Sequence, residues 1–204
     1  MPLPRGLPPI EPVSRLCHTP GRVDCLTRPG GDHTIARVPP SKASRARRGV
    51  PPSTSRVVMT NIVMPGDTNA RGTIFGGRVL EMIDKAAAIA ALRHCRTDVV
   101  TASMDYVDFR SPIRVGDIVR LEAVVNQVFR SSLEVGVRVY SENPGTGARQ
   151  HTTTAYVTLV ALGPGDRPVP APALEPQSPQ ERRRAREADR RRRLRLAMRK
   201  RARS

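Results

Sequence analysis

The sequence contains no tryptophan and only three phenylalanines and three tyrosines among its 204 residues. So few aromatic side chains leave little surface on which nucleic-acid bases could stack. The three cysteines, Cys17, Cys25 and Cys95, form no CxxC pair and have no histidine at metal-ligand spacing. This pattern argues against a disulfide scaffold and against a metal site, and it suits a reducing compartment.

Long hydrophobic runs are also lacking. No apolar stretch approaches the roughly 20 residues that span a bilayer, and the N-terminus has no apolar core of a secretory signal peptide. We therefore expect a cytoplasmic protein that does not insert into membranes. No motif in the sequence calls for a cofactor.

Basic residues are plentiful but unevenly distributed. The formal net charge is +17. Residues 1–50 hold nine basic and three acidic residues, residues 163–204 hold 14 and five, and residues 51–162 hold 12 and ten. The nearly neutral middle is therefore the candidate globular region. We predict a disordered Pro- and Arg-rich leader (1–55), one globular domain (56–162), a Pro-rich linker (163–177) and a basic C-terminal helix (178–204).

The two ends carry different local patterns. Prolines recur through the leader, which cannot bury enough apolar surface to offset its ordering entropy. Its Arg-rich composition is compatible with an organelle transit peptide, and equally with a start codon assigned upstream of the domain. At the other end, Ser178-Pro179-Gln180-Glu181 has the form of a capping box with proline at the first helical position, which predicts a helix running to about Arg199.

The middle region begins with a strand and a helix. Residues 57–64 predict a short strand that stops at Pro65-Gly66. A polar loop follows, and a helical pattern starts at Gly76-Gly77 and continues to about Arg93. One broad face of this helix is apolar and rich in alanine, which suits close packing against a sheet. Glu81 and Lys85, four residues apart on the other face, can form an ion pair.

Four further strands are predicted after this helix, at residues 99–109, 117–128, 132–141 and 150–162. In the third, Val135, Val137 and Val139 alternate with Glu134, Gly136 and Arg138, so that the valines share one face. The order of elements predicts an α+β fold in which an antiparallel β-sheet wraps around one long central helix.

The segment MPGDTNARGTIFGGRVLEMID at residues 64–84 resembles the signature of hotdog-fold acyl-CoA thioesterases. The resemblance continues through residues 93–95, 100–103, 108–112 and 115–117 and ends near Leu162, so it covers about half of the chain. It implies a hotdog fold and an enzyme that hydrolyses fatty acyl-CoA to free fatty acid and CoA. It also implies a homodimer or a higher homo-oligomer, for example a hexamer.

Asp84 is the carboxylate set at the rim of the apolar helix face, between Leu80 and Ala87. Its position alone fits a solvated aspartate paired with an Arg or Lys side chain. The resemblance implies instead that Asp84 is the catalytic carboxylate, as general base on water or as nucleophile. The sequence does not separate these two mechanisms.

Two further positions complete the implied catalytic site. Asn69 is a favoured turn residue, but the resemblance implies that it positions water or polarises the thioester from a neighbouring subunit. Gly76 and Gly77 provide permissive backbone at the start of the helix. The resemblance implies that the amide of Gly77, at the positive end of the helix dipole, binds the thioester oxygen.

Positions for the CoA moiety also follow from the resemblance. It implies contacts from two strand segments, Ala102-Ser103-Met104 and Ser131-Ser132-Leu133, which could equally be ordinary sheet residues. Arg182, Arg183 and Arg184 could meet the CoA phosphates through bidentate contacts. An arginine run is also typical of a solvated or nucleic-acid-binding face.

The alternative function is a non-catalytic hotdog oligomer that binds nucleic acid or anionic surfaces through its arginine-rich tail. No histidine is assigned a catalytic role. His94, at the C-terminal end of the central helix, is expected to cap terminal carbonyls.

Overall fold

The computed structural model describes residues 49–201, so most of the leader predicted for residues 1–55 lies outside the described residues. The described elements are, in order, η2 (Pro52–Ser55), β1 (Val57–Ile62), η3 (Pro65–Asp67), α1 (Gly76–Cys95), β2 (Asp98–Met104), β3 (Ile118–Val128), β4 (Ser132–Glu142), β5 (Arg149–Leu162), η4 (Pro164–Asp166) and α2 (Pro179–Arg201).

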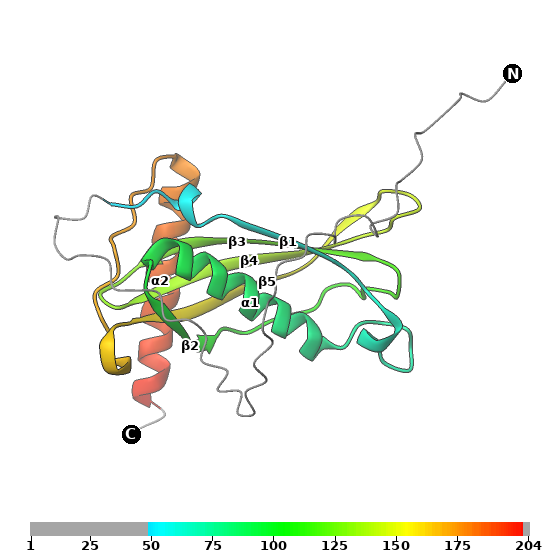
Figure 1. Ribbon diagram of the computed structural model, residues 1–204, viewed down its shortest axis with the longest axis horizontal. Coiled ribbons are helices and arrows are strands. Elements are labelled where there is room, and N and C mark those ends of the chain that lie inside the picture. The colour runs from blue at the N-terminus through cyan, green and yellow to red at the C-terminus, as the bar shows by residue number, and fades with distance from the viewer. Residues whose placement is uncertain (1–48, 202–204) are drawn as a thin grey trace, which may run out of the picture. The chain divides into compact units, whose positions relative to one another are not determined.

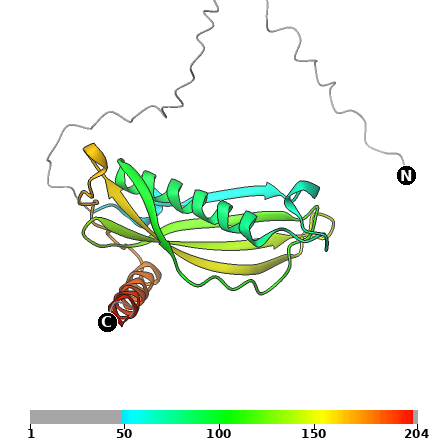
Figure 2. The ribbon, with the colours of Figure 1, turned by 90° about the horizontal axis from the view of Figure 1, so that it is seen from below.

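The five strands form one antiparallel sheet in the order β1-β3-β4-β5-β2. The sheet curls around α1, which lies along one face (Figure 1). Helix α2 lies against the opposite face, as the turned view shows (Figure 2). The predicted α+β architecture, an antiparallel sheet wrapped around one long central helix, is confirmed.

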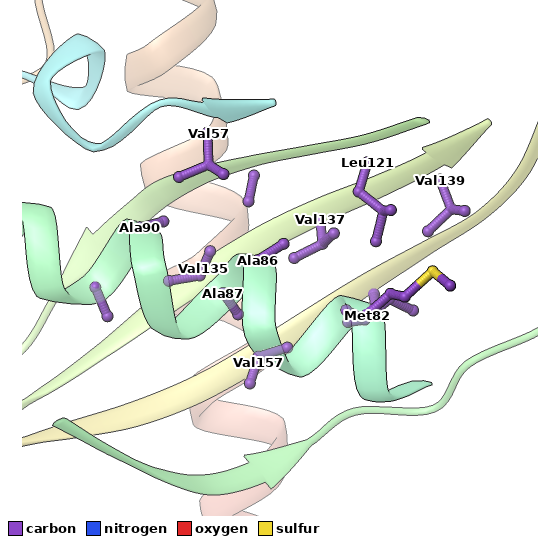
Figure 3. Close-up of a cluster of buried hydrophobic side chains, with 14 of the residues drawn as sticks. Val57, Met82, Ala86, Ala87, Ala90, Leu121, Val135, Val137, Val139 and Val157 are labelled. Carbon is purple, nitrogen blue, oxygen red and sulfur yellow. The ribbon is translucent and has the colours of Figure 1, made fainter. Parts of the chain in front are cut away.

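The core lies between α1 and the concave face of the sheet (Figure 3). Ala86, Ala87 and Ala90 of α1 have no exposed surface, and their small side chains let the helix backbone approach the strands. The alternating valines of β4 and their neighbours on β3 and β5 fill the space beneath them. Each fully buried valine contributes about 1.5–3 kcal/mol relative to an exposed one, so this contact is the main source of the domain's stability.

The sequence placed the domain boundary at residue 56, but ordered packing begins earlier. Ser55 is fully buried. Its hydroxyl donates to the Pro52 carbonyl and accepts the amide of Val125 on β3, at 2.8 and 3.0 Å. Residues 49–55 are therefore part of the domain.

The segment predicted as a linker, residues 163–177, is fastened to the domain, and we call it the strap. The Val169 and Ala171 amides donate to the Ala161 and Arg130 carbonyls at 2.9 and 3.0 Å. Val50 pairs with the strap in parallel, donating to the Ala173 carbonyl at 2.8 Å. The strap thus carries the chain from β5 to the start of α2 along a defined path.

Helix α2 begins with the predicted capping box. The Glu181 amide donates to the Ser178 hydroxyl at 3.2 Å, and the Ser178 amide donates to the Glu181 carboxylate at 3.0 Å. The helix is attached to the sheet chiefly through charge. Arg191 and Arg195 both bind Glu134 of β4, which is fully buried, and Arg195 also binds Asp105.

Strand β2 stops at Met104, earlier than the predicted residue 109. The Asp105 amide still donates to the Tyr156 carbonyl, but its carboxylate turns to Arg195 of α2. This contact leads the chain away from the sheet edge. None of the helices within residues 49–201 has the length and apolar content needed to cross a membrane.

Candidate active site

The loop before α1 is fixed at both sides, and this determines where the helix starts. The Ile74 amide donates to the Ile113 carbonyl and the Phe75 amide to the Asp67 carbonyl, at 2.9 and 3.0 Å. Arg78, in the first turn of α1, forms an ion pair with Asp67 at 2.8 Å. A hydrogen bond from the Met64 amide, together with Arg78, lowers the pKa of Asp67. Asp67 thus remains ionised and ties the loop to the helix.

The backbone amides of Gly76 and Gly77 point out of the start of α1. Arg78 and Val79 both donate to the Phe75 carbonyl, so the two glycine amides precede the first bonds of the helix and have no partner within it. A Cβ added at Gly77 would meet no atom within 4 Å. The Gly77 amide is therefore accessible at the positive end of the helix dipole, where a developing oxyanion would be stabilised.

Asn69 is held by its own loop. Its side-chain amide donates to the Thr73 hydroxyl at 2.9 Å, and its side-chain oxygen accepts the Arg71 amide at 2.9 Å. This is the turn role that asparagine favours. The half-buried side chain is oriented by these bonds and lies in the loop that precedes the Gly77 amide.

Asp84 lies two turns along α1 and is half-buried, as its predicted place at the rim of the apolar face requires. Thr101 of β2 donates its hydroxyl hydrogen to Asp84 Oδ1 at 2.7 Å. This bond joins helix to sheet edge, fixes the carboxylate rotamer and leaves Oδ2 available for another proton. The sequence analysis quoted Thr101 within the resemblance but gave it no role; its position within the VTAS segment was the only available indication.

Asp84 and the Gly77 amide lie at different heights along α1. They are seven residues apart on one straight helix, which places them roughly 10 Å apart along its axis at 1.5 Å per residue. A water activated by a carboxylate and the oxygen of the same thioester must lie within about 3 Å of their respective partners.

The first predicted CoA segment contains a break in the strand register beside Asp84. Thr101 pairs with Leu159 and Ser103 with Thr158, so Ala102 is an extra residue that forms a β-bulge. Ala102 is exposed, and the Met104 side chain packs against the core. The Ser103 hydroxyl is buried and has no hydrogen-bond partner among the described residues. Bulges of this kind occur beside active sites, where they redirect side chains.

The second predicted CoA segment lies in the turn between β3 and β4. Ser131 and Ser132 are half-buried, and the Ser131 carbonyl accepts the Ala161 amide at 2.8 Å. Leu133 has no exposed surface, so its side chain is a core residue that cannot touch a ligand. Ser132 pairs with Val160, which pairs in turn with Val100 of β2. The two predicted segments thus lie two strands apart in one sheet.

The three tail arginines do not join Asp84 of the same chain. They belong to α2, on the opposite face of the sheet from α1 (Figure 2). Arg182 donates to the Gln177 carbonyl at 3.3 Å, and Arg183 pairs with Glu187 at 3.8 Å. Arg184 is partly buried between α2 and the sheet. Any contact between these arginines and a CoA bound at Asp84 would have to come from another subunit.

His94 does not cap carbonyls at the end of α1, so that expectation is wrong. Its side chain is 1% exposed, and Nε2 lies 2.8 Å from the Pro172 carbonyl oxygen of the strap. Burial lowers the pKa of His94, because Nδ1 is enclosed without a hydrogen-bond partner in the described part of the chain. The helix instead ends at Arg96, which adopts a left-handed conformation.

Comparison with known proteins identifies the family. Residues 71–148 match the model of the thioesterase superfamily. A Bacillus subtilis protein described as an uncharacterised acyl-CoA thioester hydrolase is 48% identical over 124 residues, which are 61% of this chain and 72% of the relative.

Solved structures agree with this match. A hexameric acyl-CoA thioesterase aligns with a TM-score of 0.72 at 44% identity, covering 74% of this chain and 97% of the other. An acyl-CoA hydrolase from Staphylococcus aureus, solved with butyryl-CoA, CoA and CoA disulfide, aligns with a TM-score of 0.72 at 34% identity, covering 76% of this chain and 95% of the other.

The Staphylococcus aureus enzyme has also been solved with an asparagine, an aspartate or a threonine replaced by alanine. Those three residues are separated along their chain by the same intervals as Asn69, Asp84 and Thr101 here. The fold, the family model and the relatives agree: the chain belongs to the hotdog-fold acyl-CoA thioesterases and is an acyl-CoA hydrolase.

Proposed function

We propose that Asp84 is the carboxylate that attacks, or activates water to attack, the thioester of a fatty acyl-CoA. The observation that carries this proposal is the Thr101–Asp84 hydrogen bond, which holds a half-buried carboxylate at the sheet edge with one oxygen available. The matching intervals of the three replaced residues in the Staphylococcus aureus enzyme support it.

The active site is shared between two copies of the chain. Asp84 comes from one copy, and Asn69 and the Gly77 amide come from the other, because the two ends of the site are too far apart on one helix. Two surfaces could support such an association. Ile89 and Leu92 of α1 have apolar side chains that are 37% and 42% exposed, and β2 is an edge strand of the described sheet. The hexameric assembly of a relative supports a homo-oligomer.

In the reaction, the Gly77 amide of one subunit would donate to the thioester oxygen as negative charge develops there. Asn69 of that subunit would orient the water or the carbonyl. Asp84 of the other subunit would either take a proton from the attacking water or form a transient anhydride that water then hydrolyses. Both routes consume one water and release free fatty acid and CoA.

The direct test of the carboxylate is Asp84→Ala, assayed together with the unaltered protein on a panel of acyl-CoA esters from butyryl to palmitoyl. Loss of a catalytic base typically costs about 10²–10⁴ in rate, so hydrolysis of every ester should fall by at least a hundredfold. The panel also defines the preferred acyl chain. Hydrolysis that persists in Asp84→Ala would show that another group performs the chemistry.

Subunit complementation tests the sharing of the site. Asp84→Ala and Asn69→Ala should each be inactive alone, whereas co-expressed chains carrying one change each should recover activity. In such a pair one site has both substitutions and the other has neither. If both residues act within the same chain, the mixed assembly will remain as inactive as its parents.

The alternative, a non-catalytic oligomer that binds nucleic acid through its tail, is not favoured. Helix α2 packs on the sheet, and Arg191 and Arg195 are engaged by Glu134 and Asp105. Arg192 lies 4.1 Å above the Phe129 ring. Replacing exposed Arg186, Arg190 and Arg193 by glutamine should therefore leave thioester hydrolysis unchanged. The cytoplasmic location stays a prediction, which cell fractionation would test.

A further inference from the structure

A hollow lies between α2 and the outer face of the sheet. This face is the one opposite α1 (Figure 2). Its volume is about 370 Å³, within the range of small-molecule sites at roughly 300–1,000 Å³. The floor comes from β1, β3, β4 and β5, and α2 forms the wall. No step of the proposed hydrolysis uses this hollow.

The floor of the hollow includes Gly136 of β4 and the Asn126 side chain that packs against it. Gly136 pairs with Val124 on one side and Tyr156 on the other, and its missing side chain leaves the middle of that row low. A Cβ at this position would come within 2.6 Å of the Asn126 side-chain amide. The close packing of Asn126 thus requires glycine at residue 136.

The lining of the hollow is strongly basic. Six arginines and two glutamates contribute to it: Arg56, Arg120, Arg138, Arg183, Arg184, Arg191, Glu122 and Glu187. Both glutamates are already engaged, Glu122 by Arg120 at 2.9 Å and Glu187 by Arg183 at 3.8 Å. Arg191 is engaged by the buried Glu134 and also lies 3.6 Å above the Tyr156 ring.

Three of the six arginines that line the hollow form no ion pair with any residue in the range 49–201. They are Arg56, Arg138 and Arg184. Arg56 directly precedes β1, Arg138 lies in β4 and Arg184 lies in α2. The fold thus brings them together from distant parts of the chain. Burial lowers the pKa of Arg184; the nearby Glu181 carboxylate opposes this shift, and the nearby charges of Arg138, Arg56 and Arg183 add to it. The hollow thus concentrates positive charge that an anion would offset.

We propose that this hollow binds the phosphate groups of a small phosphorylated ligand through Arg56, Arg138 and Arg184. The planar guanidinium matches two oxygens of a phosphate at once, and such charge-assisted bonds are roughly twice as strong as neutral ones. Two sources share this chemistry: the phosphorylated end of a CoA that extends from another subunit, and a free phosphorylated metabolite. The proposal does not depend on Asp84 being the catalytic carboxylate.

Calorimetric titration of the full-length protein with inorganic pyrophosphate tests the site. We expect saturable binding of one pyrophosphate per chain. The double variant Arg138→Gln/Arg184→Gln removes two of the three free guanidinium groups while leaving the Arg191–Glu134 contact in place. At about tenfold per lost charged contact, its affinity should fall by about a hundredfold.

Arg186→Gln is the matched control, because Arg186 is an exposed residue of the same helix that does not line the hollow. It should bind pyrophosphate within about twofold of the unaltered chain. Circular dichroism of each variant checks that α2 is retained, and Arg138→Gln alone, on the sheet surface, serves if the double variant unfolds. The proposal is overturned if pyrophosphate fails to saturate, or if the pocket variants and Arg186→Gln bind equally.

Adenosine 3′,5′-bisphosphate then distinguishes the two sources. If the site takes the CoA end, this compound will displace pyrophosphate, and the double variant will show a raised KM for acyl-CoA with kcat unchanged. If the site takes a free metabolite, pyrophosphate binding will be lost in the double variant while KM for acyl-CoA stays the same. Both outcomes support a phosphate site, and neither requires the Asp84 mechanism to be correct.

Discussion

The two long helices lie on opposite faces of the same sheet and are held there by different forces. Helix α1 contributes alanines that are completely buried against valines, so its attachment is hydrophobic and depends on close fit. Helix α2 buries only Ala185 and Ala188 and relies on Arg191 and Arg195 around Glu134. The first contact defines the domain, and the second attaches an accessory element to it.

This contrast teaches where chemistry and charge can be placed. A helix packed by shape can hold a half-buried aspartate at its rim, because the rest of its face fixes the helix position. A helix packed by ion pairs concentrates positive charge near the sheet instead. The following predictions test this division, from the largest expected effect to the smallest.

Glu134→Gln should produce the largest loss of stability. It removes the fully buried ion-pair partner of Arg191 and one of the two ion-pair partners of Arg195, and removal of one partner of a buried pair costs about 3–5 kcal/mol. Urea denaturation should show this loss, whereas Arg193→Gln, exposed on the same helix, should change stability by less than about 0.5 kcal/mol. Equal effects of the two changes would mean that the ion pairs do not hold α2.

Adding bulk at buried alanines should separate the two attachments. Ala87→Leu on α1 overpacks the central core, which typically costs about 1–3 kcal/mol of global stability. Ala188→Leu on α2 adds the same group at an equally buried position, but we expect it to loosen α2 while the sheet remains folded. Limited proteolysis followed by mass spectrometry would detect cleavage near the strap in Ala188→Leu and general degradation in Ala87→Leu.

Thr101→Val should impair hydrolysis while leaving the fold intact. It removes the hydroxyl that orients Asp84 and keeps a side chain of similar shape. One lost hydrogen bond to a charged group is worth about 1.5 kcal/mol, so kcat should fall about tenfold. Thr101→Ser retains the hydroxyl and should recover most of the rate; if it is as slow as Thr101→Val, the hydrogen bond is not the cause.

His94 should give the smallest effect, seen as a dependence of stability on pH. Its pKa is lowered below 6.5 in the folded protein because the ring is buried, so the unfolded chain binds more protons at mildly acidic pH. Stability from this residue is fully present above pH 6.5 and is lost as pH falls toward the folded-state pKa. His94→Gln should flatten this slope in denaturation midpoints measured between pH 7 and pH 5.

The predicted bounds of the central helix and of β1, β3, β4 and β5 lie within a few residues of those in the structure. The predicted end of β2 does not. Periodicity was informative for these elements because one face of each is buried against α1. Periodicity did not predict where a strand ends when the end depends on a charged group far away in the sequence. Asp105 leaves the sheet to meet Arg195, and residues 49–55 and the strap lie on the domain through backbone bonds that no local pattern reveals.

The site was predicted in part. Asp84, Asn69 and Gly77 were identified by resemblance, and their catalytic roles stay predictions; Thr101 was missed because a threonine in a strand is common and gives no signal by itself. Glu134 was placed on the face of β4 opposite the valines, and in the structure it binds arginines of α2 there. That face is covered by α2. Charged residues lie on every side of this helix, so its sequence has no apolar stripe from which packing could be inferred.

The bulge at Ala102 has a consequence for insertions and deletions. Before it, Thr101 faces α1; after it, Met104 enters the core and Asp105 reaches Arg195 on the other side. Because Thr101 pairs with Leu159 and Ser103 with Thr158, deleting Ala102 would restore a regular ladder in which Met104 and Asp105 keep their faces, and only the bulge beside Asp84 would be lost. Deletion of Ala102 should therefore leave the fold intact and affect hydrolysis through the position of Thr101, whose hydroxyl holds Asp84.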